Sequence, residues 1–438
     1  MMNNRKIATD IFLAGIESVK PENLIQRFVS LEGEELTLGT LKFNLSITGK
    51  VYVIGFGKAS AMMAKELELI LSDRICEGHI ITKYHHAVPL KFMSVTEAGH
   101  PVPDENSLMG TEKILGIARK ANKGDLVICL ISGGGSALLA DLPTGCSLSD
   151  LKDLNAVLLK SGATIQKMNC IRKHLSKVKG GQLAKIIAPA TVVSLILSDV
   201  IGDQLDVIAS GPTAPDQTTF ANALAIVEKY NIENLIPASI NQYLLDGQEG
   251  KYPETLKTDE DLMKQIHNII VGNNTIALNE SARRAEQFGY QTSIITNKLE
   301  GKTEGIANDL VEIAFKTQRE RNQKKICLLF GGEPTIKVNG SGKGGRNQHL
   351  ALISAKLLEN RQGITILSGG TDGTDGPTEA AGAVCDSVTT QNAKQLQLDI
   401  RKFIDDYDSF HFFNAEGGLI QTGPTQTNVM DIIVVLID

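Results

Sequence analysis

Short apolar runs recur along the chain, and most of them end near a glycine and lead into a helical pattern. The runs cover residues 51–57, 78–82, 125–135, 191–200, 268–274, 292–296, 325–332, 363–373 and 430–438. Because they are continuous rather than alternating, they predict strands buried on both faces, and hence largely parallel sheets covered by helices. Segments with helical spacing lie between them, at 58–71, 112–121 and 274–287. The sequence therefore predicts an α/β fold.

The length and the polar segments predict more than one domain. A chain of 438 residues is long enough for two or three domains that each bury a core. The polar segment 244–264 has little apolar periodicity and is the predicted junction between two lobes, with a long surface hairpin inside one domain as the alternative. The start of the chain indicates an amphipathic helix rather than a signal peptide, and no apolar stretch reaches the ~18 residues of a membrane span. We therefore expect a cytoplasmic protein.

The charge balance narrows the classes of partner. The formal net charge of −6 repels nucleic-acid backbones and anionic membrane surfaces at long range. We therefore expect neither nucleic acid nor membrane as a partner, and any anion site must be a local cluster of positive charge. The six cysteines form no CxxC pair, and Cys129 and Cys327 lie inside apolar runs, which indicates buried reduced thiols.

The first glycine-rich loop is GFGKAS, at the end of the run at 51–57. A dinucleotide fingerprint would need a third glycine where Ser60 stands, and an acidic residue where the next strand ends at Lys83. Lys58 instead stands at the start of a helix, where its ammonium group and the helix dipole both favour an anion. A solvated surface lysine is the alternative.

The second loop is SGGGSALL, after the run that begins at Leu126. Three consecutive glycines let the backbone turn sharply and point several N–H groups at one place, which forms an anion-binding nest at a helix start. A hydroxyl donor from Ser136 would add to it, whereas a serine nucleophile would need a GxSxG frame that is absent. A structural tight turn is the alternative. The predicted ligand loop consists of Ser132, Gly133, Gly134, Gly135 and Ser136.

The third stretch, MNCIRKHLSKVKGGQLA, predicts a basic helix that ends at the glycine pair 180–181, which suits a C-cap. Helical spacing divides its polar residues between two adjacent faces, with Arg172, Ser176 and Lys179 on one and Lys173 and Lys177 on the other. A solvated basic face is the alternative to an anion site. The strand that follows ends in SDVIGD, where Asp199 and Asp203 could hold Mg²⁺ or orient a hydroxyl. Carboxylates are also common in ordinary turns.

The fourth group joins GGEPTIKVNGSGKGGRNQ (331–348) to SGGTDGTDGPTEAAG (368–382). The first stretch is not a Walker A loop, because Gly344 and not Ser or Thr follows its Gly-Lys pair. Lys343 and Arg346 offer positive charge for a polyphosphate, and Arg346 can do so with a two-pronged guanidinium. Asp372 and Asp375 offer oxygen ligands for a hard cation. Tight turns are the alternative, although turns need neither cations nor carboxylates.

Taken together, the glycine-rich strand ends, the cations and the acidic loops predict transfer of phosphate from a Mg²⁺-bound nucleotide. Such chemistry requires mainly positioning and neutralisation of charge. Residue types and spacing alone do not specify the acceptor.

The same residues identify a family. The chain resembles the glycerate 2-kinases of the MOFRL family, also called class II glycerate kinases. The matching stretches run in family order through nearly the whole chain: VIGFGKAS, EAGHPVPDENS, ISGGGSALL, NCIRKHLSKVKGGQLA, LSDVIGDQLDVIASGPTAPD, FGGEPTIKVNGSGKGGRNQ, SGGTDGTDGPTEAAGA and TGPTQTNVMDI. The resemblance implies phosphorylation of D-glycerate by ATP and Mg²⁺ at the 2-hydroxyl, giving 2-phosphoglycerate and ADP.

The resemblance also implies an architecture. An amino-terminal Rossmann-like α/β/α sandwich with a mostly parallel sheet would cover 1–250, and a smaller α/β carboxyl-terminal MOFRL domain would cover 265–438. In one alternative, the last strand would return to the first domain. The active site would lie in a cleft between the two domains. A homodimer is left open as the assembly.

Carried over residue by residue, the family's catalytic lysine falls on Lys58 and the arginine of its GGRNQ motif on Arg346. By charge, both would neutralise the moving phosphoryl group, and Asp199 would receive or orient the proton of the 2-hydroxyl. The glycine loop 132–136 and Arg172 would hold the carboxylate and hydroxyls of glycerate. The expected nucleotide-binding residues are Gly331, Gly332, Glu333, Lys343, Gly344, Gly345 and Asn347. The expected metal ligands are Asp372 and Asp375.

Two departures from the family pattern and two rival functions stay open. Gln426 stands where family members usually carry glycine, and His349, expected to be a partly exposed helix residue, stands where an acidic residue is common.

One rival function is an NAD(P)H-dependent hydroxypyruvate reductase, which needs the dinucleotide fingerprint that GFGKAS lacks. The other is an anion or nucleotide sensor without turnover.

Overall fold

The structure is a computed structural model that describes residues 3–438. The chain forms two compact units. The amino-terminal unit holds Leu24–Ser198 and Asp203–Val271, and the carboxyl-terminal unit holds the chain up to Asn23, Asp199–Gly202 and the chain from Gly272 onward. No helix within residues 3–438 is long and apolar enough to cross a bilayer.

These units divide the chain at places other than 1–250 and 265–438. The predicted junction 244–264 lies inside the amino-terminal unit, because the chain continues there into strand β9 (Ile266–Gly272). The amphipathic helix predicted at the start is α1 (Asn4–Ser18), and it belongs to the carboxyl-terminal unit. Sequence separation therefore hides one boundary, since the first helix packs against segments that lie far along the chain.

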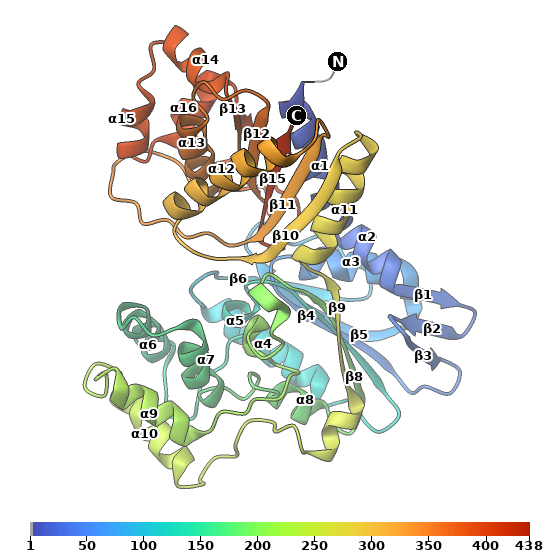
Figure 1. Ribbon diagram of the computed structural model, residues 1–438. Helices are drawn as coiled ribbons and strands as arrows, with labels where there is room; N and C mark the ends of the chain where they lie inside the picture. Colours follow the sequence, from blue (N-terminus) through green and yellow to red (C-terminus); the bar gives the residue numbers. More distant parts are fainter. Residues whose placement is uncertain (1–2) are drawn as a thin grey trace. The chain divides into compact units, whose positions relative to one another are not determined.

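The amino-terminal unit is built on a six-stranded sheet in the order β6-β5-β4-β7-β8-β9. The pairs from β6 to β8 are all parallel, as the continuous apolar runs predict. Every residue of β4 and β7 is buried, and helices α3 and α4 pack against the sheet (Figure 1). The elements of this sheet and its helices are β4 (Val51–Phe56), α3 (Ser60–Leu71), β5 (Ile75–Lys83), β6 (Ser94–Ala98), α4 (Glu105–Ala118), β7 (Leu126–Ile131), α5 (Gly135–Leu138), α8 (Gln182–Ile187), β8 (Thr191–Leu197) and β9.

The same unit carries two parts that the apolar runs do not predict. One is a small antiparallel sheet of β1 (Val29–Glu32), β2 (Glu35–Leu38) and β3 (Leu41–Asn44). The other is a helical cluster with its own apolar core, made of α6 (Leu148–Lys160), α7 (Ile165–His174), α9 (Phe220–Lys229) and α10 (Ala238–Gln248). Helix α2 (Pro21–Phe28) spans the boundary between the units.

The carboxyl-terminal unit has a mixed six-stranded sheet in the order β10-β11-β15-β12-β13-β14. Only β10 and β11 pair in parallel, and the last strand lies antiparallel between β11 and β12. The prediction of largely parallel sheets is therefore wrong for this unit, and the last strand does not return to the other sheet. A run of apolar residues reports burial on both faces, and it carries no information on strand direction.

Alternate residues of β15 explain why this strand reads as one apolar run. Ile433, Val435 and Ile437 belong to the core cluster that includes α12 and α13, whereas a Cβ atom on Gly15 of α1 would meet Ile432. The elements of the unit are α1, α11 (Asn274–Gln287), β10 (Gln291–Leu299), α12 (Thr303–Glu320), β11 (Ile326–Gly332), α13 (Arg346–Leu357), β12 (Ile364–Gly370), β13 (Gly382–Asp386), α14 (Thr389–Gln395), α15 (Ile400–Asp405), α16 (Ser409–Glu416), β14 (Leu419–Ile420) and β15 (Asp431–Ile437).

Arg5 fixes the first helix to this unit. Its Nε donates to Asp386 at 2.9 Å, and its Nη2 donates to Glu416 at 2.9 Å, where the Glu416 side chain is fully buried. Replacing Arg5 by Ala leaves these carboxylates without a cation, so we expect the free energy of unfolding to fall by about 3–5 kcal/mol in urea titrations. The control is Lys6→Ala, an exposed cation one residue along, which should cost little. Equal losses in both variants would contradict this role for Arg5.

Candidate active site

The two glycine loops of the amino-terminal unit are bonded to each other at the ends of neighbouring strands. The amide of Lys58 donates to the carbonyl of Gly133 at 2.9 Å, and the amide of Ala59 donates to Ser132 Oγ at 3.0 Å. The loop after β4 and the loop after β7 thus form one structure, as expected at the carboxyl ends of parallel strands. Ser132 serves this junction, so its hydroxyl has a structural task.

The backbone of the second loop has the predicted features of an anion nest. Gly134 has a φ of 81°, and within residues 3–438 the amides of Gly133 and Gly134 meet no hydrogen-bond acceptor. A Cβ atom on Gly134 would lie 2.9 Å from His100 Nε2 and 3.2 Å from Cγ of Lys58. The glycine loop, the lysine stem and the imidazole therefore surround one point.

Sequence reasoning missed His100, although it lies in the quoted stretch EAGHPVPDENS. Burial, together with the nearby charges of Lys58 and Lys83, lowers the pKa of His100 to about 4. The imidazole is therefore neutral near pH 7, and it can donate to or accept from a hydroxyl without adding charge.

A cavity of about 390 Å³ in the same unit is lined by Ser136 and Arg172, two of the predicted substrate-binding residues. Arg172 Nε donates to Asn155 Oδ1 at 2.9 Å, and no carboxylate among the described residues pairs with this guanidinium. Burial lowers the pKa of Arg172. A half-buried cation without a counter-ion in a cavity wall is what an anion site requires.

Lys179 also lines this cavity, and its Nζ donates to the carbonyl of Leu139 at 2.7 Å. Burial, with a smaller contribution from Arg172, lowers its pKa to about 8, although Asp141 opposes the shift. Arg172, Ser176 and Lys179, which were predicted to share one helix face, all line this cavity, although they do not lie on one helix. Helix α7 ends at His174 rather than at the glycine pair, and Gly181 is instead the N-cap of α8.

The solvated basic face, the alternative for this stretch, does not form. Lys173 is 3% exposed, and its Nζ lies 3.1 Å from Asp206 Oδ2 and 3.3 Å from Asp216 Oδ1. Lys177 alone among the four cations of the stretch is exposed. Burial opposes ionisation of Asp216, but the charge of Lys173 and hydrogen bonds from Thr218 hold its pKa below the ordinary value.

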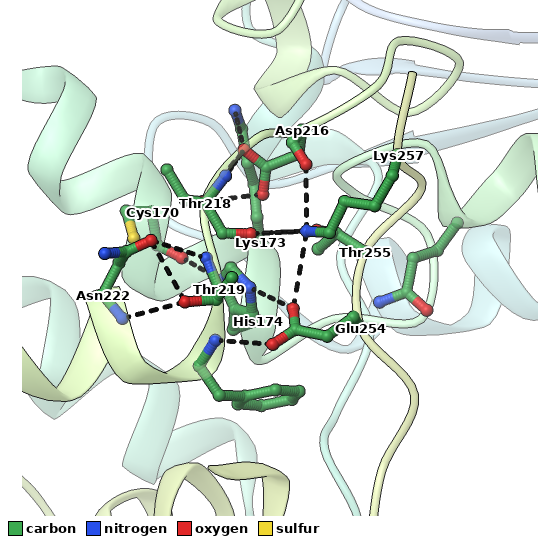
Figure 2. A network of polar contacts seen from close by, with 12 residues as sticks. Cys170, Lys173, His174, Asp216, Thr218, Thr219, Asn222, Glu254, Thr255 and Lys257 are labelled. Atoms are coloured by element: carbon green, nitrogen blue, oxygen red, sulfur yellow. Dashed lines mark hydrogen bonds and ion pairs between the residues drawn. The ribbon is translucent and has the colours of Figure 1, made fainter. Parts of the chain in front are cut away.

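Figure 2 shows how this ion pair ties distant segments of the amino-terminal unit together. Lys257 Nζ donates to the carbonyls of Asp216 and Thr218, at 3.0 and 2.6 Å. Glu254 accepts from the amide of Phe220 at 3.0 Å and lies 3.1 Å from His174 Nε2. The stretch predicted as a basic helix thus supplies Arg172, Ser176 and Lys179 to a cavity wall, and Lys173 and His174 to a buried structural network.

In the carboxyl-terminal unit, Arg346 is the first residue of α13 and is held by a buried carboxylate. Its Nε and Nη2 donate to the two oxygens of Asp431 at 2.6 and 2.9 Å, and its Nη1 donates to Glu333 at 2.9 Å. Burial opposes ionisation of Arg346, but the bonds to Asp431 raise its pKa above the ordinary value. Burial raises the pKa of Asp431 to about 6, although Arg346 pulls it down. Asp431, the first residue of the last strand, was not among the predicted site residues.

Asp375, a predicted metal ligand, caps the start of α13. Its carboxylate accepts from the amides of Asn347 and Gln348 at 3.1 and 2.8 Å and from Gln348 Nε2 at 3.1 Å. Burial raises the pKa of Asp375 against these bonds. Both oxygens are thus occupied by the start of the helix that carries Arg346, and the groups of residues 3–438 contain no cluster of three side chains with metal-binding spacing.

A cavity of about 650 Å³ in this unit is lined by some of the predicted nucleotide-binding, catalytic and metal-binding residues. Its lining includes Glu333, Gly344, Gly345, Arg346, Asp372 and Asp375. The other predicted residues lie outside this lining. Lys343 Nζ lies 4.3 Å from the centre of the Phe410 ring, and Asn347 accepts at Oδ1 from Ser368. Gly331 and Gly332 are buried in β11, and half-buried Asp199 follows β8.

The two departures have clear structural settings. Gln426 has a φ of 63°, a conformation that favours glycine, which accounts for the glycine usual in the family. The expectation that His349 is partly exposed is wrong: it is 2% exposed, and its ring stacks on Tyr407 with centroids 4.7 Å apart. A charged side chain would be costly at such a position.

Comparisons with known proteins agree with this layout. Residues 7–245 match a domain of unknown function (DUF4147), and residues 326–431 match the MOFRL family. A glycerate 2-kinase of Pyrococcus horikoshii is 40% identical over 100% of this chain and 98% of its own. The chain belongs to the MOFRL family of glycerate kinases.

The chain is also similar to a solved structure and to a relative that has a different name. A crystal structure of a glycerate kinase from Thermotoga maritima matches with a TM-score of 0.88 and 37% identity, over 99% of both chains. A relative from Agrobacterium vitis, 40% identical over 89% of this chain and 87% of its own, is provisionally named a hydroxypyruvate reductase. The α/β fold expected of a MOFRL glycerate kinase is therefore confirmed.

Because of the buried network, we expect Lys173 and Lys177 to differ strongly in their contribution to the free energy of unfolding. Lys173→Ala leaves Asp216, whose side chain is 2% exposed, without its cation, so the free energy of unfolding should fall by about 3–5 kcal/mol. Lys177→Ala removes an exposed charge and should change it by less than ~0.5 kcal/mol. Denaturant titrations of both variants measure the difference. Similar small losses would show that the network contributes little.

Asp431 predicts a pH dependence of stability. Its folded pKa of about 6 lies above the ordinary value of 3.8, so between these values the folded chain binds more protons than the unfolded chain. The contribution of Asp431 to the free energy of unfolding should therefore fall as pH rises from about 4 to about 6. Measured against Asp431→Asn, the wild-type protein should lose relative stability over that window. A difference that is constant with pH would contradict the raised pKa.

Proposed function

We propose that this protein is a glycerate 2-kinase that transfers the γ-phosphoryl group of ATP to the 2-hydroxyl of D-glycerate. The observation that carries the proposal is the cationic, hydrogen-bonding end of the amino-terminal sheet, in a chain whose full-length relatives are named glycerate kinases. Free amides at Gly133 and Gly134, a neutral imidazole and an unpaired guanidinium suit a small hydroxy acid.

The predicted substrate-binding residues and two predicted catalytic residues each have a role in this proposal. Arg172 binds the carboxylate of glycerate, and the amides of the glycine loop and His100 bind its hydroxyls. Lys58 neutralises the phosphoryl group as the bond from the 2-hydroxyl oxygen to phosphorus forms. Asp199 accepts the proton that leaves the 2-hydroxyl as the bond from phosphorus to the ADP oxygen breaks.

The carboxyl-terminal unit would hold the nucleotide. Arg346 at the start of α13 provides the positive charge, and Asp431 and Asp375 fix its position. Magnesium in nucleotide sites is usually held by one or two carboxylates together with phosphates. Asp372 fits this requirement, because among residues 3–438 only its Oδ1 accepts hydrogen bonds at the side chain, both from Thr374. When bound, the ion would supply neutralisation of the phosphate charges.

An assay with D-glycerate, ATP and Mg²⁺ tests the activity. Phosphorus NMR of the product should show the 2-phosphate, and exclusive formation of the 3-phosphate would reject the position of transfer. The reductase alternative is supported by the Agrobacterium relative's name, and it predicts oxidation of NADH by hydroxypyruvate without ATP. We expect no such oxidation, because the GFGKAS loop lacks the third glycine and the acidic partner.

The roles proposed for Lys58 and Arg346 can be tested by measuring kcat in variants. Lys58→Ala and Arg346→Ala should each lower kcat by about 10²- to 10³-fold, because each removes charge neutralisation from the transition state. Matched controls are Lys65→Ala, exposed on α3, and Lys337→Ala, exposed in the loop before Arg346. Circular dichroism should show a folded chain in all four variants, although Arg346→Ala leaves buried Asp431 without its cation and should unfold at a lower denaturant concentration. Near-normal turnover in either of the first two would reject that residue's role.

A further inference from the structure

The cavity beside Arg172 is larger and more apolar than glycerate requires. Its volume of about 390 Å³ lies in the range of sites that enclose ligands of drug size. Most of its wall comes from apolar side chains, among them Leu151, Leu154 and Leu159 of α6. Glycerate carries a polar group on each of its carbons, so it has little apolar surface to place against this wall.

Apolar side chains at the same cavity remain in contact with water. Leu159 is 69% exposed and Val102 is 55% exposed, and both belong to the lining. Covering such side chains with an apolar ligand chain releases water and favours binding in proportion to the area removed from solvent. The wall therefore provides a driving force that the hydroxyls of glycerate leave unused.

The charged residues of the lining indicate which polar group such a ligand would carry. Arg172, Lys152 and Lys179 face a single carboxylate, Asp141. That carboxylate is already occupied, because its two oxygens accept from the hydroxyl of Ser176 and the amide of Lys177. Arg172 uses only Nε, toward Asn155, so its terminal amino groups have no acceptor within the described chain. A carboxylate with its two oxygens matches this free fork.

We infer that this cavity binds a monocarboxylate with a short apolar chain, its carboxylate on Arg172 and its chain along Leu154 and Leu159. The inference rests on the proposed function in one respect: Arg172 would also bind the carboxylate of glycerate. The two ligands then exclude each other, and the cavity defines a class of apolar carboxylates that the enzyme admits beside its hydroxy acid.

Calorimetric titration of the full chain without nucleotide tests the inference with acetate, butyrate and hexanoate. The dissociation constant should tighten about three- to fourfold for each added methylene, since each buries apolar surface. Hexylamine, which has the same chain and the opposite charge, should not bind. Equal dissociation constants along the series, or equal binding of hexylamine, would overturn the inference.

Two variants separate the carboxylate contact from the apolar contact. Arg172→Gln should weaken hexanoate at least tenfold and leave hexanol unaffected, whereas Leu159→Ser should weaken hexanoate and leave acetate unaffected. Lys177→Gln, an exposed cation nearby, is the charge control and should change neither. Leu159 is exposed, so its variant decides the apolar contact even where Arg172→Gln fails to fold. Unchanged hexanoate binding in Leu159→Ser would contradict the chain's position.

Turnover then distinguishes this inference from the proposed function. Hexanoate should raise the KM for D-glycerate and leave kcat unchanged, because both carboxylates need Arg172. A chain without kinase activity would reject the proposed function, while the calorimetric series would still decide the inference. An active kinase with a flat calorimetric series would reject the inference alone.

Discussion

The cost of burying charge governs where the functional groups of this protein lie. A cation taken out of water is stable only beside an anion or well-placed acceptors. Arg346 meets this condition through both oxygens of Asp431, and Lys173 meets it through Asp206 and Asp216. Arg172 meets it only in part, with a single bond to Asn155. The cation without a buried counter-ion is therefore the one that a ligand anion would stabilise most.

The backbone positions these charges through strand ends rather than through long side-chain networks. In the amino-terminal sheet, two loops from neighbouring parallel strands bond to each other, so Lys58 is held at a fixed place in the turn before α3, which begins at Ser60 and not at Lys58 as expected. In the carboxyl-terminal sheet, Asp431 begins β15, and its strand pairs with β11 and β12 on either side. A residue with neighbours on both sides of a sheet has little freedom, so the guanidinium that it binds is also held. Such preorganisation reduces the reorganisation that accompanies phosphoryl transfer.

The sequence predicted the α/β class, the two glycine loops and nine of the twelve strands in the two six-stranded sheets, because continuous apolar runs and glycines report burial and turning directly; β6, β13 and β14 were missed. Strand direction in the second sheet was not predictable in this way, since β15 is equally apolar in either direction. His100 and Asp431 were also missed, because each gains its role only from residues far away in sequence. The sequence also carried no sign that Asp375, a predicted metal ligand, caps α13, because its bonds to the amides of Asn347 and Gln348 depend on the three-dimensional position of that helix.

The two cavities differ in charge, and this difference bears on which ligand each unit takes. Around the first, three cations accompany one carboxylate, Asp141, whose oxygens are already bonded. Around the second, Arg346 is accompanied by four carboxylates, those of Glu300, Glu333, Asp372 and Asp375. A bare anion is attracted to the first lining and repelled by the second, whereas a nucleotide that carries Mg²⁺ brings the cation that the second lacks. This difference in charge supports the proposal that the hydroxy acid binds in the amino-terminal unit and the metal-bound nucleotide in the carboxyl-terminal unit.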